Sequence, residues 1–205
     1  MFPDHDIRPE TTKEAMMERC PDCGGADLTA RSLEKYHYRE SGLDNVWLHG
    51  GGVIEFTCGS CGRKSIAVHK ESQLLQVIAM SLLMRPGRLR GPELRYLRHA
   101  CDLTQEQLAH KLDVLRAAVI RWERGAVERL DRARVLHLRM VLLKEFQQAL
   151  SEPENDHLED WHRKQLAEFA GRFTEEFERV FTRRARVTVV VRNRDDAWEP
   201  PSAAA

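Results

Sequence analysis

Residues 103–125 read LTQEQLAHKLDVLRAAVIRWERG, and this stretch predicts two short helices joined by a tight turn. Thr104 is a good N-cap, and Gln107 stands three residues later, where a capping box needs it. Apolar residues recur at helical spacing on both sides of residues 113–114, which mark the turn. Gly125 is placed to end the second helix. A plain helical hairpin with a leucine-rich core has the same spacing, so spacing alone indicates no function.

Helical patterns continue on both sides of this stretch, over residues 89–150. Upstream, Pro92 suits the first turn of another helix, and Cys101 falls on the apolar face of that helix as a small core residue. Downstream, a longer helix is predicted by apolar residues at helical spacing, namely Val135, Leu138, Val141, Leu142 and Phe146. Residues 89–150 therefore predict a helical domain with its own core.

Four of the five cysteines lie before this block, in two C-x2-C pairs separated by 34 residues. A glycine follows each pair, which lets backbone amides turn toward the sulfur atoms. Two such pairs are typical of a zinc ribbon, and four cysteine ligands leave no open coordination position. The sequence therefore predicts one structural Zn2+ ion per chain, bound by Cys20, Cys23, Cys58 and Cys61.

Other interpretations of the cysteine pairs remain. A redox-active pair is less consistent, because such motifs occur singly beside a β-α-β pattern, which this chain lacks. His49 and His69 are near enough in sequence to be rival ligands, although surface histidines are the simpler interpretation.

The cysteine region also contains the clearest strand patterns. Residues 32–40 (SLEKYHYRE) and 46–56 (VWLHGGGVIEF) predict two short strands, with residues 49–52 as the turn. After it, residues 72–84 (SQLLQVIAMSLLM) predict an apolar helix that stops at Pro86.

The C-terminal segment begins with a polar joint at residues 151–156. An amphipathic helix is predicted over residues 157–182, with a strand over residues 186–192. The helix carries four aromatic residues on one stripe: Trp161, Phe169, Phe173 and Phe177. Such a stripe either packs on the helices of the same chain or forms a two-fold interface, with residues 187–191 pairing across it as an edge strand.

Charge is balanced over the whole chain, with 32 basic and 32 acidic residues, but not locally. Residues 80–150 carry fourteen basic and eight acidic residues, whereas residues 151–182 carry four and nine. A local basic surface is what phosphate contacts require, although a solvated face fits equally well. The chain has no apolar run long enough for a membrane span, no secretory signal, and too few cysteines for a disulfide scaffold. We therefore expect a cytoplasmic protein with no membrane partner.

Residues 103–125 resemble the lambda-repressor-like helix-turn-helix family in the words LTQEQLA, KLDV and RAAVIRWERG. With the preceding cysteine ribbon and residues 36–46, the chain is similar to the MqsA-type antitoxin and regulator family, whose zinc domain is also called the YgiT-type zinc finger. The resemblance covers about residues 18–145. It implies a homodimer that binds double-stranded DNA at a palindromic operator, and in many members it implies autoregulation of an operon shared with a toxin protein.

The resemblance also implies which residues contact DNA. The second helix, Arg116–Glu123, enters the major groove, Arg121 reads bases, and Gln105 holds the phosphate backbone. Arg116 and Ala117 complete the candidate DNA-binding set. Positions that the family fills with polar residues carry instead Leu115, Ala117, Ala118 and Ile120. We therefore expect modest specificity, or specificity carried by the two arginines.

Together these patterns predict a mainly α protein with a small β zinc ribbon. The expected order is a flexible N-terminus (1–17), the four-cysteine ribbon (18–69), a linker helix (70–88), the helix-turn-helix domain (89–150) and a dimerisation or partner-binding extension (151–205). The expected function is a zinc-containing, sequence-specific transcriptional regulator or repressor, with an autoregulating antitoxin as its narrower form. The alternative is an adaptor that binds a partner protein through the ribbon and the C-terminal helix. An enzyme is not expected, because no catalytic motif is present.

Overall fold

A computed structural model describes residues 17–84, 88–150, 188–194 and 197–199 of the chain. In chain order its strands and helices are β1 (Leu28–Ser32), β2 (Lys35–His37), the 3-10 helix η2 (Arg39–Ser41), β3 (Val46–His49), β4 (Val53–Cys58), β5 (Lys64–Val68), α1 (Glu71–Met84), α2 (Gly91–Ala100), α3 (Gln105–Lys111), α4 (Arg116–Glu123), the 3-10 helix η3 (Ala126–Arg129), α5 (Arg132–Leu150), β6 (Val189–Arg194) and β7 (Ala197–Glu199).

The prediction of a mainly α fold is wrong. The described residues form five α-helices and seven strands in two sheets, so the fold mixes α and β structure. One sheet has the order β1-β4-β5 and is antiparallel throughout. The other has the order β2-β3-β6-β7, and in it β3 and β6 run parallel. The second sheet was not foreseen because half of it comes from residues 189–199, far along the chain from β3.

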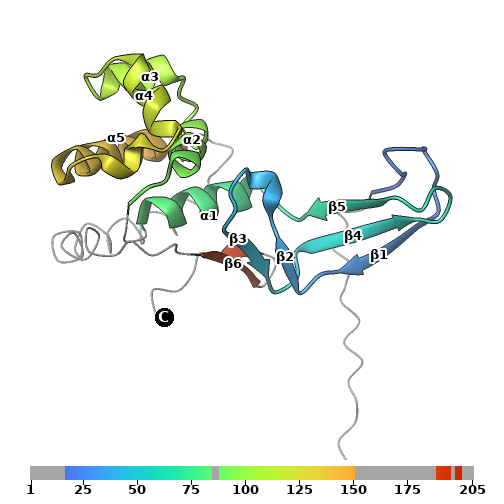
Figure 1. Ribbon diagram of the computed structural model, residues 1–205. Coiled ribbons are helices and arrows are strands. Elements are labelled where there is room, and N and C mark those ends of the chain that lie inside the picture. The colour runs from blue at the N-terminus through green and yellow to red at the C-terminus, as the bar shows by residue number, and fades with distance from the viewer. Residues whose placement is uncertain (1–16, 85–87, 151–187, 195–196, 200–205) are drawn as a thin grey trace, which may run out of the picture.

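The two sheets share one long hairpin that is kinked in the middle (Figure 1). Backbone pairing continues across the kink, where Leu33 N donates to Val53 O at 2.9 Å and Gly50 N donates to Glu34 O at 3.1 Å. The prediction of a turn at residues 49–52 is therefore wrong. The chain reverses at residues 38–45 instead, between β2 and β3.

The kink depends on three consecutive glycines. Gly50, Gly51 and Gly52 have φ angles of 83°, 81° and 72°, which other residues adopt only with strain. The β6–β7 hairpin packs directly on the kink, because a Cβ at Gly50 would lie 2.6 Å from Asn193 O and a Cβ at Gly52 would lie 3.0 Å from Trp198 Cζ2. These glycines therefore serve both the bend and the close approach of the C-terminal strands.

The C-terminal strand over residues 186–192 was predicted, and β6 occurs slightly later, at Val189–Arg194. It is not an edge strand that pairs across a two-fold axis. It lies between β3 and β7 of its own chain, with Val46 opposite Val189 and Leu48 opposite Val191. The four aligned side chains are buried, so β6 completes the apolar face of this sheet.

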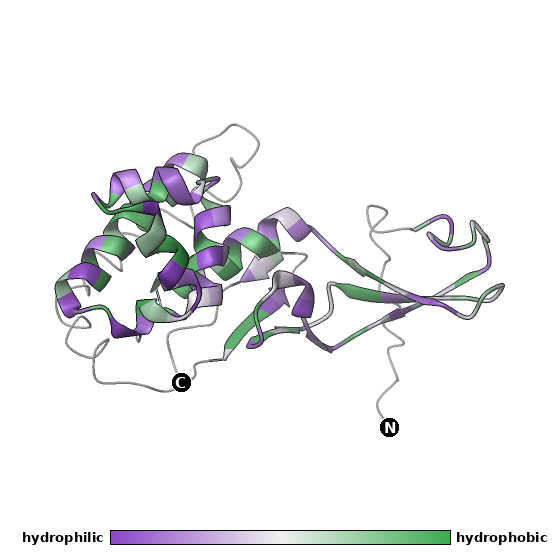
Figure 2. Ribbon diagram, turned by 45° about the horizontal axis from the view of Figure 1, so that its top comes forward, coloured by the Kyte–Doolittle hydropathy of each residue, from purple (hydrophilic) through white to green (hydrophobic). Residues whose placement is uncertain are grey.

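Helix α1 connects the second sheet to the other helices. It packs against β6 and β7 on one side and against α2 and α5 on the other. One continuous hydrophobic cluster consequently runs from Val46 and Leu48 in β3 through α1 to Phe146 in α5. Figure 2 shows this arrangement, with hydrophobic residues gathered where the helices face one another.

The helical part matches its sequence patterns closely. Thr104 and Gln107 form the expected capping box at the start of α3. Four of the five apolar residues predicted as core of α5 are buried, namely Val135, Leu138, Leu142 and Phe146. Cys101 is buried as expected, and its burial raises the pKa of the thiol to about 12. The helix predicted over residues 157–182 and nearly all of the N-terminal segment 1–17 lie outside the described residues.

Candidate metal centre and α3–α4 surface

The two C-x2-C pairs fold into matching turns at the far end of the β1-β4-β5 sheet (Figure 1). In the first turn, Gly24 N donates to Cys20 O at 2.8 Å, and in the second, Gly62 N donates to Cys58 O at 2.8 Å. Both glycines have a φ angle of 72°, which explains why glycine follows each cysteine pair. Each turn therefore presents two sulfur atoms in the same way.

The four sulfur atoms lie close enough together to hold a metal ion. Cys20 Sγ is 3.7 Å from Cys61 Sγ, Cys23 Sγ is 3.6 Å from Cys58 Sγ, and all four lie within 4.8 Å of one another. A tetrahedral ion with metal–sulfur bonds of about 2.3 Å would separate its ligands by about 3.8 Å. The donor set and its size thus fit a four-thiolate metal site, and the separations are far too long for disulfide bonds.

Backbone N–H groups and neighbouring sulfur atoms shift the pKa values of two of the thiols in opposite directions. The pKa of Cys58 is lowered to about 7, mainly because the backbone N–H of Cys61 donates to its sulfur, with a second N–H from Ser60. The N–H of Gly25 acts in the same direction on Cys23, but the neighbouring sulfur atoms outweigh it and raise the pKa of Cys23 to about 12. A bound cation would favour the thiolate form of these side chains, since thiolates are the form that binds metal.

The rival histidine ligands do not take part. Among the described residues, the four cysteines form the one group of three or more potential metal ligands close enough to share an ion, and neither histidine belongs to it. His69 is not a surface residue, because it is buried beside β7 and its backbone oxygen accepts a hydrogen bond from Trp198 Nε1 at 2.6 Å.

Helices α3 and α4 occupy the residues expected for a helix pair and meet at a tight turn. Asp113 in the turn has a φ angle of 53°, and Val114 N donates to Ala109 O at 3.0 Å. Aspartate tolerates this left-handed conformation better than most residues. Ala109 and Val119 are buried at the contact between the two helices, as the helix spacing predicts.

A buried carboxylate at the end of α4 holds three helices together. Glu123 is 4% exposed, and Arg98 Nε from α2 donates to its Oε1 at 2.6 Å. Gln105 Nε2, at the start of α3, donates to the other carboxylate oxygen at 2.7 Å. Burial raises the pKa of Glu123, but these hydrogen bonds outweigh it and hold the pKa below its ordinary value. The network fixes the orientation of α4 relative to α2 and α3.

The burial of Arg98 and Glu123 was not predicted from the sequence. The available signal was their spacing, because Glu123 falls four residues after buried Val119 and Arg98 falls four residues after buried Leu94. A charged residue at a position that the helical period assigns to the core requires a charged or polar partner.

The structure places the candidate DNA-binding residues in two different environments. Arg116, Ala117 and Arg121 are exposed along α4. Gln105 is half-buried and its amide belongs to the Glu123 network, so it borders this surface rather than projecting from it. Within the described part of the chain, neither Arg116 nor Arg121 forms an ion pair with a carboxylate. The exposed side of α4 is therefore basic, and we call Leu115, Arg116, Ala117, Arg121 and Arg124 the α4 surface.

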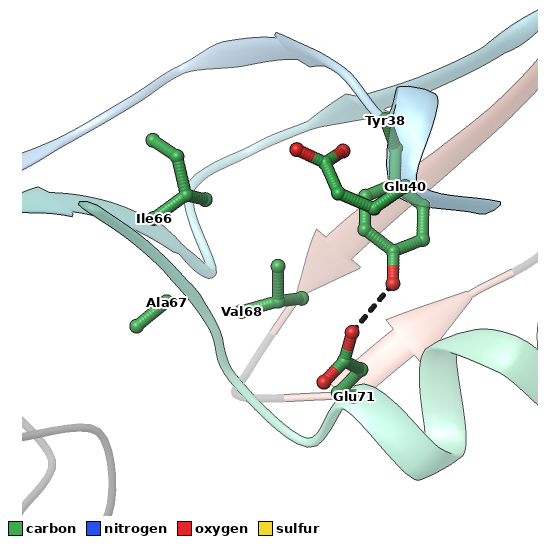
Figure 3. Close-up of a pocket in the computed structure, with 6 residues that line it drawn as sticks. All are labelled: Tyr38, Glu40, Ile66, Ala67, Val68 and Glu71. Carbon is green, nitrogen blue, oxygen red and sulfur yellow. Dashed lines mark hydrogen bonds between the residues drawn. The ribbon is translucent and has the colours of Figure 1, made fainter. Parts of the chain in front are cut away.

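A cavity of about 260 Å³ lies where the two sheets meet, between η2, β5 and the start of α1 (Figure 3). Tyr38 Oη donates to Glu71 Oε1 at 2.6 Å across it, and Tyr36 Oη donates to Glu40 Oε1 at 2.6 Å. Its two carboxylates thus already accept hydrogen bonds from tyrosines. The cavity is accordingly a weaker candidate for a functional site than the cysteine cluster or the α4 surface.

Comparisons of the chain with protein-family models, curated proteins and solved structures return no match. None of the helices in the described part of the chain combines the length and apolar character needed to cross a membrane.

Proposed function

We propose that this chain is a zinc-containing transcriptional regulator that binds double-stranded DNA, with α4 as the helix that enters the major groove. One observation carries the proposal: α4 is held by the buried Arg98–Glu123 pair, yet its outer side is open and presents Arg116 and Arg121. A short, rigidly oriented helix with exposed basic residues suits insertion into the groove, where arginine pairs with guanine O6 and N7.

Salt dependence tests this proposal most directly. We expect the full-length, zinc-loaded chain to bind the duplex upstream of its own gene, with affinity falling as salt rises. Each phosphate neutralised by a cation contributes about 0.9 to the slope of log affinity against log salt. Fluorescence anisotropy over a salt series measures this slope, and weak binding that ignores sequence would contradict the proposal.

Arg121 provides the matching mutational test. Arg121→Ala should lower affinity for the preferred sequence by about 1–3 kcal/mol while nonspecific binding changes little, because a base contact is lost. The control is Arg31→Ala, which removes an arginine from β1, outside the helices, whose side chain is 72% exposed. Equal effects of the two substitutions would indicate a general charge effect and not base reading.

The proposed role of the metal is structural. Zinc suits a site with four cysteine ligands, and such a site has no open position for a substrate. The cysteine cluster lies at the opposite end of the molecule from α4 (Figure 1), so we assign it no direct part in base reading.

The narrower form of the proposal is an autoregulating antitoxin that binds a palindromic operator as a homodimer. It is supported by the resemblance of residues 18–145 to the MqsA-type family. Co-purification with the product of an adjacent gene, together with release of that gene's promoter when the chain is deleted, tests it.

The alternative function is an adaptor that binds a partner protein without a DNA role. The position of the cysteine turns favours it, because they project away from the helices and their surface is available to another protein (Figure 1). A chain that captures a partner through residues 18–27 and 58–63, but binds no duplex, would support this alternative.

A further inference from the structure

Leu115 combines two unfavourable features. Its side chain is 80% exposed, the largest exposure among the large hydrophobic residues in the described part of the chain. It is also the N-cap of α4, in extended conformation with φ −72° and ψ 143°, and its side chain makes no capping hydrogen bond. Serine, threonine, aspartate or asparagine would cap the helix and suit water better. Leucine at this position forgoes the capping hydrogen bond and gains no burial in return, which points to a role in binding.

The residues near Leu115 indicate which class of ligand this surface would bind. Ala117, the second residue of α4, is also exposed, so a small apolar surface lies at the N-terminal end of the helix. Arg116 beside it, Arg121 farther along α4 and Arg124 at the C-cap are also exposed, whereas the helix's one acidic residue, Glu123, is buried. An apolar protein surface would have to desolvate these arginines. The major groove of DNA offers both complements, because thymine presents a methyl group among phosphates and guanine acceptors.

We infer that Leu115 and Ala117 read thymine methyl groups in the major groove, and that arginines of the α4 surface contact neighbouring guanines or phosphates. This inference rests on the proposed function and specifies its substrate: duplex sites with thymine at a defined position in each half-site. Apolar contact takes the place of hydrogen bonding as the source of discrimination at that position.

The DNA arm of the test removes single methyl groups. The full-length, zinc-loaded chain first selects duplexes from a randomised pool, and each thymine of the selected site is then replaced by deoxyuridine. This change removes the methyl group and leaves base pairing intact. We expect one thymine per half-site at which replacement weakens binding about fourfold, the amount that one buried methyl group contributes. Restoring the methyl group should restore affinity.

The protein arm uses Leu115→Asn. Asparagine is a good N-cap, so this variant should melt at a higher temperature than the native chain. It should nevertheless bind the selected duplex about tenfold more weakly, because a leucine contact is lost. It should also bind the thymine and deoxyuridine duplexes equally at the sensitive position. A structural role for Leu115 would lower melting temperature and affinity together.

Met140→Gln is the matched control, since Met140 is 49% exposed but lies on α5. It should leave both affinity and the sensitivity to deoxyuridine unchanged. Selected duplexes that bind equally well with thymine and deoxyuridine would overturn this inference and leave DNA binding intact. Failure to select any duplex would overturn the proposed function as well.

Discussion

At the cysteine end, residues 18–27 and 58–63 bury only Cys20 and Cys58, whereas at the helical end Leu94, Leu108 and Val119 are fully buried. The hydrophobic cluster covers the second sheet and all five α-helices but contains none of the four clustered cysteines. The helical end can be held by burial of apolar surface. The cysteine end has no comparable core, so under the proposed function a bound ion would hold it together.

Metal removal should give the largest difference between the two ends. Structural zinc sites in small domains contribute an apparent binding free energy of about 10–16 kcal/mol, which is also folding energy. Chelation, or Cys58→Ser, should release the ion and unfold both cysteine turns while the helices remain folded. Metal analysis and hydrogen exchange read by segment measure this, and loss of protection in α2–α5 to the same extent would contradict the comparison.

Breaking the buried Arg98–Glu123 ion pair should instead destabilise the helical end. Glu123→Gln leaves the Arg98 guanidinium buried without its carboxylate, which we expect to lower the free energy of unfolding by about 3–5 kcal/mol. The control at the cysteine end is Asp22→Asn, since the Arg63–Asp22 pair is largely exposed and should contribute about 0–1 kcal/mol. Urea unfolding of both variants tests this; equal losses would refute the distinction.

The same carboxylate predicts a pH dependence. Because the pKa of Glu123 is held below its ordinary value of 4.5, its contribution to stability is present above that pH. It should be lost as the pH falls through the lowered value, when the carboxylate takes up a proton. Acid titration of the unfolding free energy should therefore show a smaller decline in Glu123→Gln than in the native chain.

Trp198 lies where the second sheet meets helix α1. Its substitution should lower the free energy of unfolding by less than loss of the Arg98–Glu123 pair does. Trp198→Phe removes the hydrogen bond from Nε1 to His69 O, leaving a buried carbonyl without that donor, at an expected cost of about 1–3 kcal/mol. Trp47→Phe is the control, because Trp47 lies on the opposite face of the same sheet and is only half-buried. Thermal unfolding that ranks the two variants the other way would contradict this account.

The smallest expected changes in stability concern two residues with left-handed backbone conformation, Gly24 and Asp113. Gly24→Ala should destabilise the cysteine turn by about 1–2 kcal/mol, because its φ angle of 72° suits only glycine well. Asp113→Gly in the α3–α4 turn should change stability by less than about 1 kcal/mol, since glycine relieves strain but loses more entropy on folding. Chemical unfolding of both variants measures the contrast.

The features that were predicted from sequence depend on neighbours within a few residues. The Thr104–Gln107 capping box, the apolar positions of α5 and the glycine after each cysteine pair are all of this kind. The clustering of Cys20 and Cys23 with Cys58 and Cys61 was also predicted, because a shared ion gives distant pairs one meeting point.

The mixed fold was not predictable in the same way. Residues 49–52 have the composition of a turn, yet their neighbours pair with β1 and β2 on the far side of the hairpin, and the glycines form a kink. The run of glycines predicts that the chain bends here, but the direction of the bend depends on which strands pair.

The local elements, the meeting of the four cysteines and the basic, partly apolar character of α4 follow from the sequence alone, because hydrogen bonding within a turn and helical periodicity are short-range. Three features emerge only in the folded chain: β6 pairs with β3, Glu123 meets Arg98, and Leu115 remains exposed. These outcomes depend on contacts between residues far apart in the chain. Their stability comes from apolar surface and charge buried jointly by several elements, which no single segment encodes.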